Sequence, residues 1–248
     1  MDRYSIAIPA RIASSRLPGK MLKQLNGKPV VQHVIERVLQ VRNCQQIYVL
    51  SDSEEIVRLA RALGVCGVMT SEKCCSGTER IVSVLDQITG EWIVNVQGDE
   101  PFIDPLLIER LIEQTKAIRN KILTAVYKLK DCAEIGNHNV VKVVLDNQNN
   151  AIYFSRSPIP FIRGEKVEDW SKKYVFWGHL GIYVYRRDLL EKYHDLAPSA
   201  LEKMESLEQL RFLSNGYTIS TLEANGRSVA IDTAEDLAKA EQIIAGKI

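Results

Sequence analysis

Three cations lie close together near the start of the chain, in a stretch otherwise built from small and polar residues. Arg11, Arg16 and Lys20 belong to the run IPARIASSRLPGK, which follows an apolar strand predicted over Tyr4 to Ile8. Guanidinium and ammonium groups match phosphate oxygens in charge and in hydrogen bonding. The pattern therefore predicts a loop that binds a triphosphate.

This loop is not one of the two common glycine-rich phosphate loops. Met21 follows Lys20 where a Walker A loop has Ser or Thr, and the chain contains no GxGxxG motif. Loops are generally polar. This stretch alone therefore leaves a second interpretation open, in which three surface cations share one connecting segment.

Two carboxylates are candidate ligands for a divalent cation. Asp99 follows the apolar strand predicted over Trp92 to Val96, and Asp232 follows the apolar run Val229 to Ile231. Magnesium prefers one or two carboxylates together with phosphate oxygens and water. Each residue also has a plain interpretation: Asp232 as the N-cap of a helix predicted over Ala234 to Ile244, and Asp99 as a turn residue.

Other polar residues carry a weaker signal. His179 lies in an apolar run, which on its own favours a buried, hydrogen-bonded histidine. Glu205 and Glu208 are spaced to share one face of a helix predicted over Ser199 to Leu213. That face either receives sugar hydroxyls or is simply solvated.

Strands and helices alternate through the first half of the chain. The predicted strands are Gln46 to Leu50, Val65 to Met69 and Trp92 to Val96, and the helices between them run over 30–39, 54–63 and 81–88. Such units form a mainly parallel, Rossmann-like sheet flanked by helices, which binds ligands at the carboxyl ends of its strands. We expect the Arg11 loop, Ser51-Asp52, 76–80 and 97–100 to converge there on one pocket.

The second half is richer in strands. They are predicted over 122–129, 140–145, 151–154, 179–185 and 217–222, with a hairpin turn at 147–150, a helix over 189–194 and a charged loop over 163–173. We expect one domain over 1–248. About 1–120 would bind the nucleotide, about 121–222 would form a smaller β-rich part, and 223–248 would return to the main sheet.

Composition excludes several classes of function. The 248 residues include 32 Lys plus Arg and 31 Asp plus Glu, so no basic excess attracts nucleic acid. The five cysteines are odd in number and form no CxxC pair, which argues against a disulfide framework or a zinc site. There is no apolar run long enough to insert in a membrane and no secretory pattern after Met1, so we expect a cytoplasmic location.

Several motifs, in order along nearly the whole chain, resemble one enzyme family. IPARIASSRLPGK, NGKPVVQHVIERV, SGTER, NVQGDEP, VKVVLD, YFSRSPIP, HLGIYVYR, LEQLR and IDTAEDL are similar to the 3-deoxy-manno-octulosonate cytidylyltransferases, or CMP-Kdo synthetases. The resemblance implies a nucleotide-diphospho-sugar transferase-like fold. It also implies a homodimer that uses Mg²⁺ to convert CTP and Kdo into CMP-Kdo and pyrophosphate, for lipopolysaccharide biosynthesis.

The resemblance also implies roles for single residues. The triphosphate site would include Arg11, Ser15 and Lys20, and the SGTER segment with Ser76, Gly77, Thr78 and Arg80 would enclose cytosine and ribose. Asp99 and Asp232 would bind magnesium. The sugar site would be lined by Gln97, Arg156, His179, Tyr183, Glu208 and Gln209, with Arg156 as a partner for the sugar carboxylate.

Departures from the family pattern are modest. Ile12-Ala13 stand where an aromatic residue and a glycine are common, and Leu50-Ser51-Asp52 where Ala-Thr-Asp is common. Two alternatives remain: a cytidylyltransferase for a related acid, such as 8-amino-Kdo or a sialic acid, and a catalytically silent nucleotide-binding protein.

Overall fold

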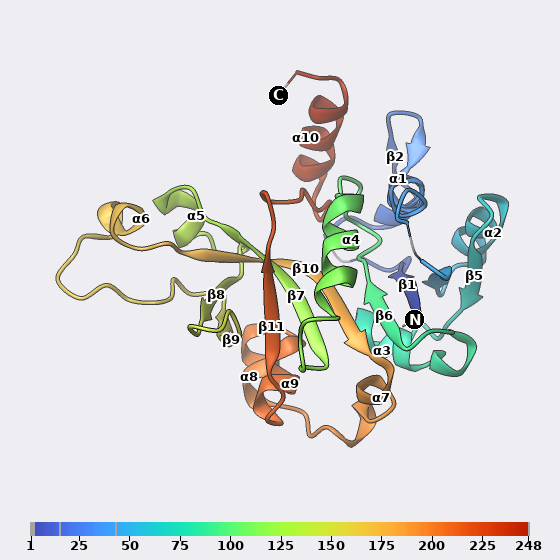
Figure 1. The fold of residues 1–248 in the computed structure, drawn as a ribbon. Helices are drawn as coiled ribbons and strands as arrows, with labels where there is room; N and C mark the ends of the chain where they lie inside the picture. The colour runs from blue at the N-terminus through green and yellow to red at the C-terminus, as the bar shows by residue number, and fades with distance from the viewer. Residues whose placement is uncertain (1–2, 15, 43, 248) are drawn as a thin grey trace. The chain divides into compact units, whose positions relative to one another are not determined.

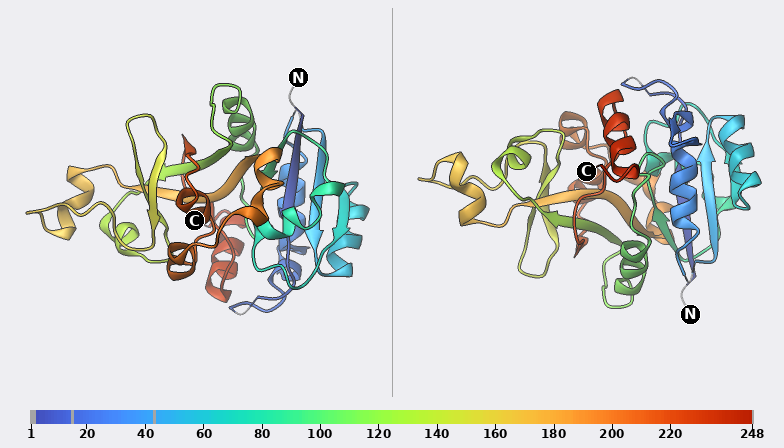
Figure 2. Two further views of the ribbon diagram at one scale, coloured as in Figure 1. Left: turned by 90° about the horizontal axis from the view of Figure 1, so that it is seen from below. Right: turned by 90° about the horizontal axis from the view of Figure 1, so that it is seen from above.

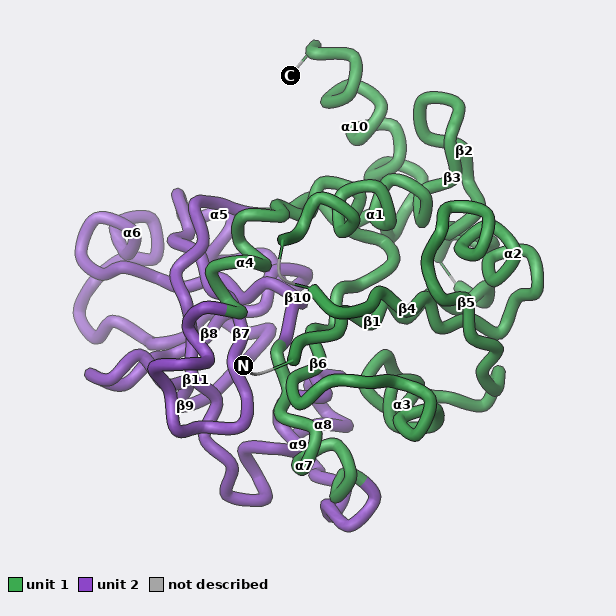
Figure 3. Tube along the Cα trace, turned by 45° about the vertical axis from the view of Figure 1, so that its right-hand side comes forward, with its two compact units in different colours: residues 1–112, 184–193, 228–248 green, residues 113–183, 194–227 purple. Residues whose placement is uncertain are grey.

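The computed structural model describes residues 3–14, 16–42 and 44–247 (Figure 1). The chain forms two compact units, coloured separately in Figure 3. Unit 1 contains residues 1–112, 184–193 and 228–248, and unit 2 contains residues 113–183 and 194–227.

Parallel strands form the centre of unit 1. β6 (Trp92–Asn95), β1 (Tyr4–Pro9), β4 (Gln46–Ser51) and β5 (Cys66–Met69) are paired in that order, all in parallel. Every residue of β1 and β6 is buried, as expected for parallel strands covered on both faces. The strands predicted for the first half of the chain are confirmed.

Amphipathic helices pack on these strands. α1 (Val30–Val38) buries the apolar face predicted from its spacing, α2 (Glu54–Ala62) contacts β4 and β5, and α3 (Gly77–Val82) contacts β1. Unit 1 also contains α7 (Arg187–Leu190), α10 (Ala234–Ile244) and the small hairpin of β2 (Gln24–Leu25) and β3 (Lys28–Pro29).

Two helices of unit 1 differ from the prediction. The helix expected through Ile88 ends at Val82, and a 3₁₀ turn (Leu85–Gln87) follows it. α4 (Pro105–Gln114) was not predicted, although its buried residues Leu107, Ile108, Leu111 and Ile112 have helical spacing. The sequence of this segment therefore did contain the apolar periodicity that predicts a helix.

Unit 2 is built on a mixed set of strands. β7 (Ile122–Lys128) and β11 (Ile219–Glu223) pair in parallel, whereas β8 (Lys142–Leu145) pairs antiparallel with both β9 (Ala151–Ser155) and β10 (Trp177–Arg186). The predicted turn joins β8 to β9, with Asn149 at φ 59°. The last residues of β10 belong to unit 1.

The predicted helix over Ser199 to Leu213 is wrong. The structure has two helices, α8 (Ala200–Glu205) and α9 (Gln209–Ser214), separated by Ser206 in the left-handed conformation (φ 53°). A left-handed residue ends a helix. Glu205 and Glu208 therefore do not share a helix face.

The charged segment expected to be a loop contains short helical turns. A 3₁₀ turn (Val167–Asp169) leads into α6 (Trp170–Lys173), and α5 (Cys132–Gly136) lies beside them. Trp170 stacks on Phe176 and contacts Phe161 edge-on, so the segment has a small aromatic core. Figure 2 shows it reaching away from the strands of its own unit.

All five cysteines are free. Among the described residues, no helix is both long and apolar enough to cross a bilayer.

Candidate functional site

Three of the segments expected at the carboxyl edge of unit 1 are linked by direct hydrogen bonds. The amide of Gly98 donates to the carbonyl of Pro9 (3.2 Å), and the amide of Ala10 donates to that of Leu50 (2.9 Å). The amide of Ile12 donates to Asp52 Oδ1 at 2.8 Å. The first loop is therefore anchored to the segments that follow β4 and β6.

Gly98 permits the closest of these approaches. A Cβ added at this position would lie 2.9 Å from the carbonyl oxygen of Pro9 and 3.1 Å from the Cβ of Ala10. Contacts that short require the backbone to move. The absence of a side chain at position 98 therefore brings the turn that carries Asp99 against the end of β1.

A buried ammonium group joins the two candidate metal ligands. Lys20 Nζ forms a short ion pair with Asp99 Oδ2 and lies 2.9 Å from Asp232 Oδ1. Arg16 Nη2 lies 3.0 Å from the second oxygen of Asp232. The exposed fractions of the Lys20, Asp99 and Asp232 side chains are 8%, 19% and 35%, so the carboxylates lie at a partly open site.

The charges of this cluster stabilise one another. Burial alone would lower the pKa of Lys20, but Asp99 and Asp232 outweigh it and the pKa is raised. Burial alone would raise the pKa of Asp232, but Lys20 and Arg16 lower it. The two carboxylates thus converge on a single cation, and their oxygens are the donor type that Mg²⁺ prefers.

The plain interpretation of Asp232 as a helix cap is wrong. Thr233 is the N-cap of α10, and it forms a capping box with Asp236. The Asp232 side chain instead binds Lys20 and Arg16. The amide of Ile231 donates to the carbonyl of Asp99 (2.9 Å), which holds the two aspartates side by side although the sequence separates them widely.

Glu100 adds a third carboxyl group next to this cluster. Its side chain is buried, and its Oε2 has no hydrogen-bond partner among the described residues. Burial and the nearby charge of Asp99 raise the pKa of Glu100 to about 7. Across the described residues, however, no group of three or more side chains is arranged to hold a metal ion.

The first loop borders an open pocket of about 540 Å³. Its walls include Arg11, Ile12, Ala13, Ser14, Pro18 and Gly19. Arg11 is exposed, so its guanidinium is accessible to a ligand. Ser15, which we expected to bind the triphosphate, lies outside the described residues.

The SGTER segment forms the start of α3 and the turn before it. Ser76 caps the helix by accepting a hydrogen bond from the amide of Glu79 (3.1 Å). Gly77 packs beside Gln97, whose own amide group donates to Asn95 Oδ1 at 3.2 Å. Both Gly77 and Gln97 therefore lie at the carboxyl edge of unit 1.

Two side chains of the same segment point into the protein. Thr78 and Arg80 are only 1% and 2% exposed. Arg80 donates to the hydroxyl of Thr70 and pairs with Asp52 at 3.5 Å, while Asp52 also accepts the Ile12 amide. Arg80 thereby supports the first loop from beneath.

His179 in unit 2 is a neutral histidine. Its Nε2 lies 3.0 Å from Thr124 Oγ1, and the Thr124 hydroxyl donates to the carbonyl of Ile182 (2.7 Å). The hydroxyl must therefore accept from His179, which places the proton on Nε2. Burial lowers the pKa of His179 to about 3, and its ring packs between Phe154 and Tyr183 with centroid distances of 5.0 and 5.3 Å.

Arg156 in unit 2 is half-buried and anchored to backbone. Its Nε donates to the carbonyl of Glu205 (2.7 Å) and its Nη1 to that of His138 (3.2 Å). Glu208 is the N-cap residue of α9, and Gln209 is the first residue of that helix. Gln209 is 3% exposed and its Nε2 has no partner among the described residues, so it carries a buried donor that a ligand would satisfy.

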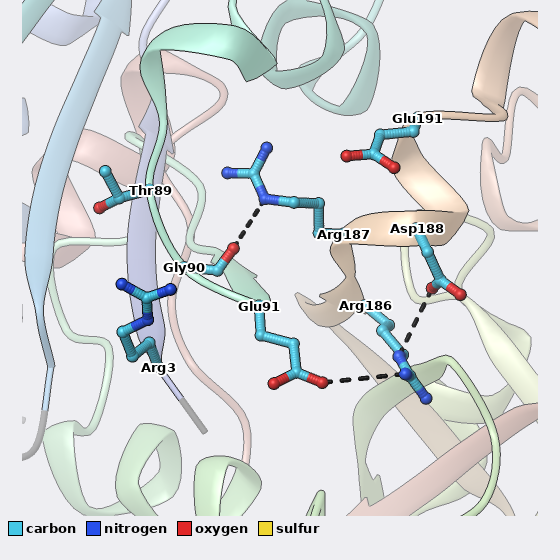
Figure 4. Close-up of a pocket in the computed structure, with 8 residues that line it drawn as sticks. All are labelled: Arg3, Thr89, Gly90, Glu91, Arg186, Arg187, Asp188 and Glu191. Carbon is cyan, nitrogen blue, oxygen red and sulfur yellow. Dashed lines mark hydrogen bonds and ion pairs between the residues drawn. The ribbon is translucent and has the colours of Figure 1, made fainter. Parts of the chain in front are cut away.

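A second pocket, of about 530 Å³, lies at the amino ends of β1 and β6, away from the aspartates (Figure 4). Arg186 lies 3.8 Å from Glu91 and 3.6 Å from Asp188, and Arg187 donates to the carbonyl of Gly90 (2.7 Å). Charges of both signs thus neutralise one another there. We assign no function to this pocket.

Sequence reasoning missed several partners that the fold supplies. The missed contacts all join distant segments of the chain. They are the ion pairs of Lys20 with both aspartates, the ion pair of Arg16 with Asp232, and the link from Arg80 through Asp52 to the first loop. Local patterns contain no signal for such contacts. The position of each aspartate within three residues after an apolar run was the available signal for the site itself.

Comparisons with known proteins place the chain in a family. A family model described as "Cytidylyltransferase" matches residues 6–221. The 3-deoxy-manno-octulosonate cytidylyltransferase of Geotalea daltonii is 43% identical to this chain, over 96% of each of the two chains. That of Escherichia coli is 38% identical, over 100% of this chain and 98% of the relative.

Solved structures agree with this placement. A CMP:2-keto-3-deoxy-manno-octonic acid synthetase in complex with CTP superposes with a TM-score of 0.91 at 38% identity, over 99% of this chain and all of the other. A 4-diphosphocytidyl-2C-methyl-D-erythritol synthase of Anaerococcus prevotii shares only the fold, with a TM-score of 0.64 at 16% identity over 98% and 99% of the two chains. The predicted class, a mainly parallel α/β sheet flanked by helices, is confirmed, and the chain belongs to the 3-deoxy-manno-octulosonate cytidylyltransferase family.

Proposed function

We propose that this chain transfers CMP from CTP to the anomeric hydroxyl of 3-deoxy-manno-octulosonate, giving CMP-Kdo and pyrophosphate and so activating Kdo for lipopolysaccharide biosynthesis. The observation that carries the proposal is the cluster of Lys20, Asp99 and Asp232 beside a cationic loop. Membership of the family supplies the substrates. A nucleotide-binding protein without catalytic activity would not need this cluster.

Asp99 and Asp232 would hold the magnesium ion. Their oxygens already converge on one cation, the Lys20 ammonium, and Asp99 is fixed by the turn at Gly98. Bound there, Mg²⁺ would neutralise charge on the phosphate oxygens and lower the pKa of the attacking hydroxyl. No protein base is then required, and we assign none.

The cations of the first loop would bind the triphosphate. Arg11 is exposed at the loop pocket, and Lys20 sits next to the proposed metal ligands. Transfer of CMP needs the sugar hydroxyl in line with the leaving pyrophosphate and the phosphate charge neutralised. We expect Arg11, Ser15 and Lys20 to perform that positioning and neutralisation, with Ser15 proposed from the family motif alone.

The SGTER segment would enclose cytosine and ribose. Ser76 and Gly77 lie at the start of α3, where they reach the carboxyl edge of unit 1. Thr78 and Arg80 are buried, so their proposed contribution is to shape this wall and to hold the loop through Asp52.

The sugar-binding roles that we propose rest on the family motifs. Gln97 belongs to unit 1, and Arg156, His179, Tyr183, Glu208 and Gln209 belong to unit 2. Arg156 would bind the carboxylate. The unpartnered Nε2 of Gln209 would donate to a sugar oxygen, and His179, with its proton on Nε2, would offer Nδ1 as an acceptor to a hydroxyl.

We further propose a homodimer that acts in the cytoplasm, where CTP is available. Support for association comes from apolar side chains exposed along one segment of unit 2. The exposed fractions are 75% for Phe161, 46% for Val167, 41% for Tyr174 and 47% for Val175. Clustered exposed apolar residues are typical of protein interfaces.

The experiment is a pyrophosphate-release assay with Mg²⁺. Each of the four nucleoside triphosphates is combined separately with Kdo, 8-amino-Kdo and N-acetylneuraminate. The proposal predicts fast release with CTP and Kdo. Faster release with 8-amino-Kdo or N-acetylneuraminate would assign the chain to that acid, and CTP binding without release for every acid would leave only a nucleotide-binding protein.

A further inference from the structure

Two charged side chains hold the main chain of Arg156 from opposite sides. The Arg156 amide donates to Glu205 Oε2 at 2.9 Å, and its carbonyl accepts from Lys142 Nζ at 2.5 Å. Strand β9 ends one residue earlier, at Ser155, so ladder hydrogen bonds no longer fix the backbone here. The two charges replace them.

Lys142 is fully buried, and all its donors are used. Its ammonium group donates to the carbonyls of Asn137 (2.8 Å), Val140 (2.7 Å) and Arg156. An ammonium has three N–H groups, so none remains for a ligand. Burial, followed by the nearby charge of Arg156, lowers the pKa of Lys142 to about 8. Burying a charge is costly unless it is hydrogen-bonded, and here three carbonyl groups, including that of Arg156, supply the hydrogen bonds.

Glu205 connects Arg156 to the beginning of α9. Its second oxygen accepts from the Ser155 hydroxyl (2.6 Å), and its carbonyl accepts from Arg156 Nε (2.7 Å). The carbonyl of Ser206, the left-handed residue that ends α8, lies 3.5 Å from Arg156 Nη2. The same contacts therefore tie Arg156 to the segment that leads to Glu208 and Gln209.

Hydrogen bonds to carbonyl groups orient the guanidinium of Arg156 but do not use all of its N–H groups. Of the five N–H groups of an arginine, the carbonyls of Glu205, His138 and Ser206 take three. The other two are on the terminal nitrogens, the groups that bind a carboxylate. An arginine anchored in this way loses little freedom when it binds an anion.

We propose that Lys142 and Glu205 are positioning residues that orient the Arg156 guanidinium toward the carboxylate of the acceptor sugar. This inference rests on the proposed function and deepens its sugar site. Neither residue touches the substrate. Both act through Arg156.

The test compares Lys142→Met and Glu205→Gln with the wild type. Lys142→Met removes the donors but keeps the length, and Lys130→Met is the matched control because Lys130 is an exposed lysine of the same unit. Pyrophosphate release is measured with CTP and Kdo varied separately. We expect KM for Kdo to rise about tenfold in both variants, the cost of losing a hydrogen bond to a charged group, with KM for CTP and kcat nearly unchanged.

A double-mutant cycle with Arg156→Ala separates positioning from general damage. If the two residues act through Arg156, adding Lys142→Met or Glu205→Gln to Arg156→Ala causes little further loss. Should Lys142→Met fail to fold, Glu205→Gln carries the test, since it preserves the shape of the side chain.

The outcomes are distinguishable. A wild-type chain that releases no pyrophosphate overturns the proposed function and this inference with it. If the wild type is active, three results overturn this inference and leave the proposed function intact. Both variants keep a normal KM for Kdo, or KM for CTP rises as much as KM for Kdo. The third result is that the loss of activity in each variant adds fully to the loss caused by Arg156→Ala.

Discussion

One ammonium group lies between the two carboxylates that we assign to magnesium. Lys20 is nearly buried, and its pKa is raised by Asp99 and Asp232 despite the opposing effect of burial. In this arrangement the lysine holds together two acids that would otherwise repel each other. Both acids stay partly exposed, at 19% for Asp99 and 35% for Asp232, as the proposed binding of a metal ion requires.

Replacing either acid should therefore impair the use of metal. We expect Asp99→Asn and Asp232→Asn to lower kcat/KM about a hundredfold at limiting Mg²⁺, because each removes a negative oxygen ligand. Titration of activity with Mg²⁺ measures the effect, and Asp86→Asn, at an exposed site of unit 1, is the control. Near-normal turnover of Asp99→Asn at limiting Mg²⁺ would refute the metal assignment.

His179 should make folding stability depend on pH. Its pKa is lowered from 6.5 to about 3 by burial, so between these values the unfolded state binds more protons than the folded state. Stability contributed by this residue is complete above pH 6.5 and is lost as pH falls toward 3. The free energy of unfolding is measured with urea at several pH values across this range. We expect it to change less steeply with pH in His179→Gln than in the wild type.

The matched control for that series is His138→Gln, since His138 is exposed. An unchanged slope in His179→Gln would mean that His179 titrates normally in the folded protein. In that case burial would not hold the imidazole neutral below pH 6.5.

At the scale of elements, the close packing of the turn after β6 on β1 places Asp99. Gly98→Ala would bring a Cβ to 2.9 Å from the Pro9 carbonyl, and we expect a loss of about 1–3 kcal/mol in stability. Gly226→Ala is the matched control, because nothing lies within 4 Å of its added Cβ. Thermal unfolding that is equal in the two variants would contradict the packing argument.

The elements also show where sequence reasoning succeeds and where it stops. Buried strands such as β1 and β4, and the helix α10, follow from apolar runs and caps that are local in sequence. The break at Ser206 was missed because a non-glycine residue takes the left-handed conformation there, and local propensity does not predict that.

In the candidate site, too, local sequence patterns indicated some residues, whereas only the fold reveals the contacts between them. Asp99 and Asp232 became candidates because each follows an apolar run, and the motif resemblance then favoured the metal role over the helix cap and the turn. The Lys20 ion pairs, the support of the loop by Arg80 and Asp52, and the anchoring of Arg156 depend on contacts between distant segments. Tertiary packing, not local pattern, decides such contacts. The motif resemblance pointed to the family without revealing them.

At the scale of the whole molecule, the proposed dimer can be tested on its exposed apolar segment. We expect the wild type to sediment at twice the chain mass, and Phe161→Ser to shift it toward the monomer because the side chain is 75% exposed. Leu106→Ser, at a 59% exposed site of unit 1, is the control. A monomeric wild type would refute the dimer, and an unaffected Phe161→Ser dimer would refute this interface.

The most direct test of the central claim is the identity and ratio of the products formed from CTP, Kdo and Mg²⁺. Mass spectrometry of the sugar product is combined with quantification of pyrophosphate. We predict one CMP-Kdo, carrying the α-phosphate of CTP, for each pyrophosphate released, with both lost together in Asp99→Asn. Free CMP or inorganic phosphate in place of the sugar nucleotide, or release that does not depend on Kdo, would contradict transfer of CMP to the sugar.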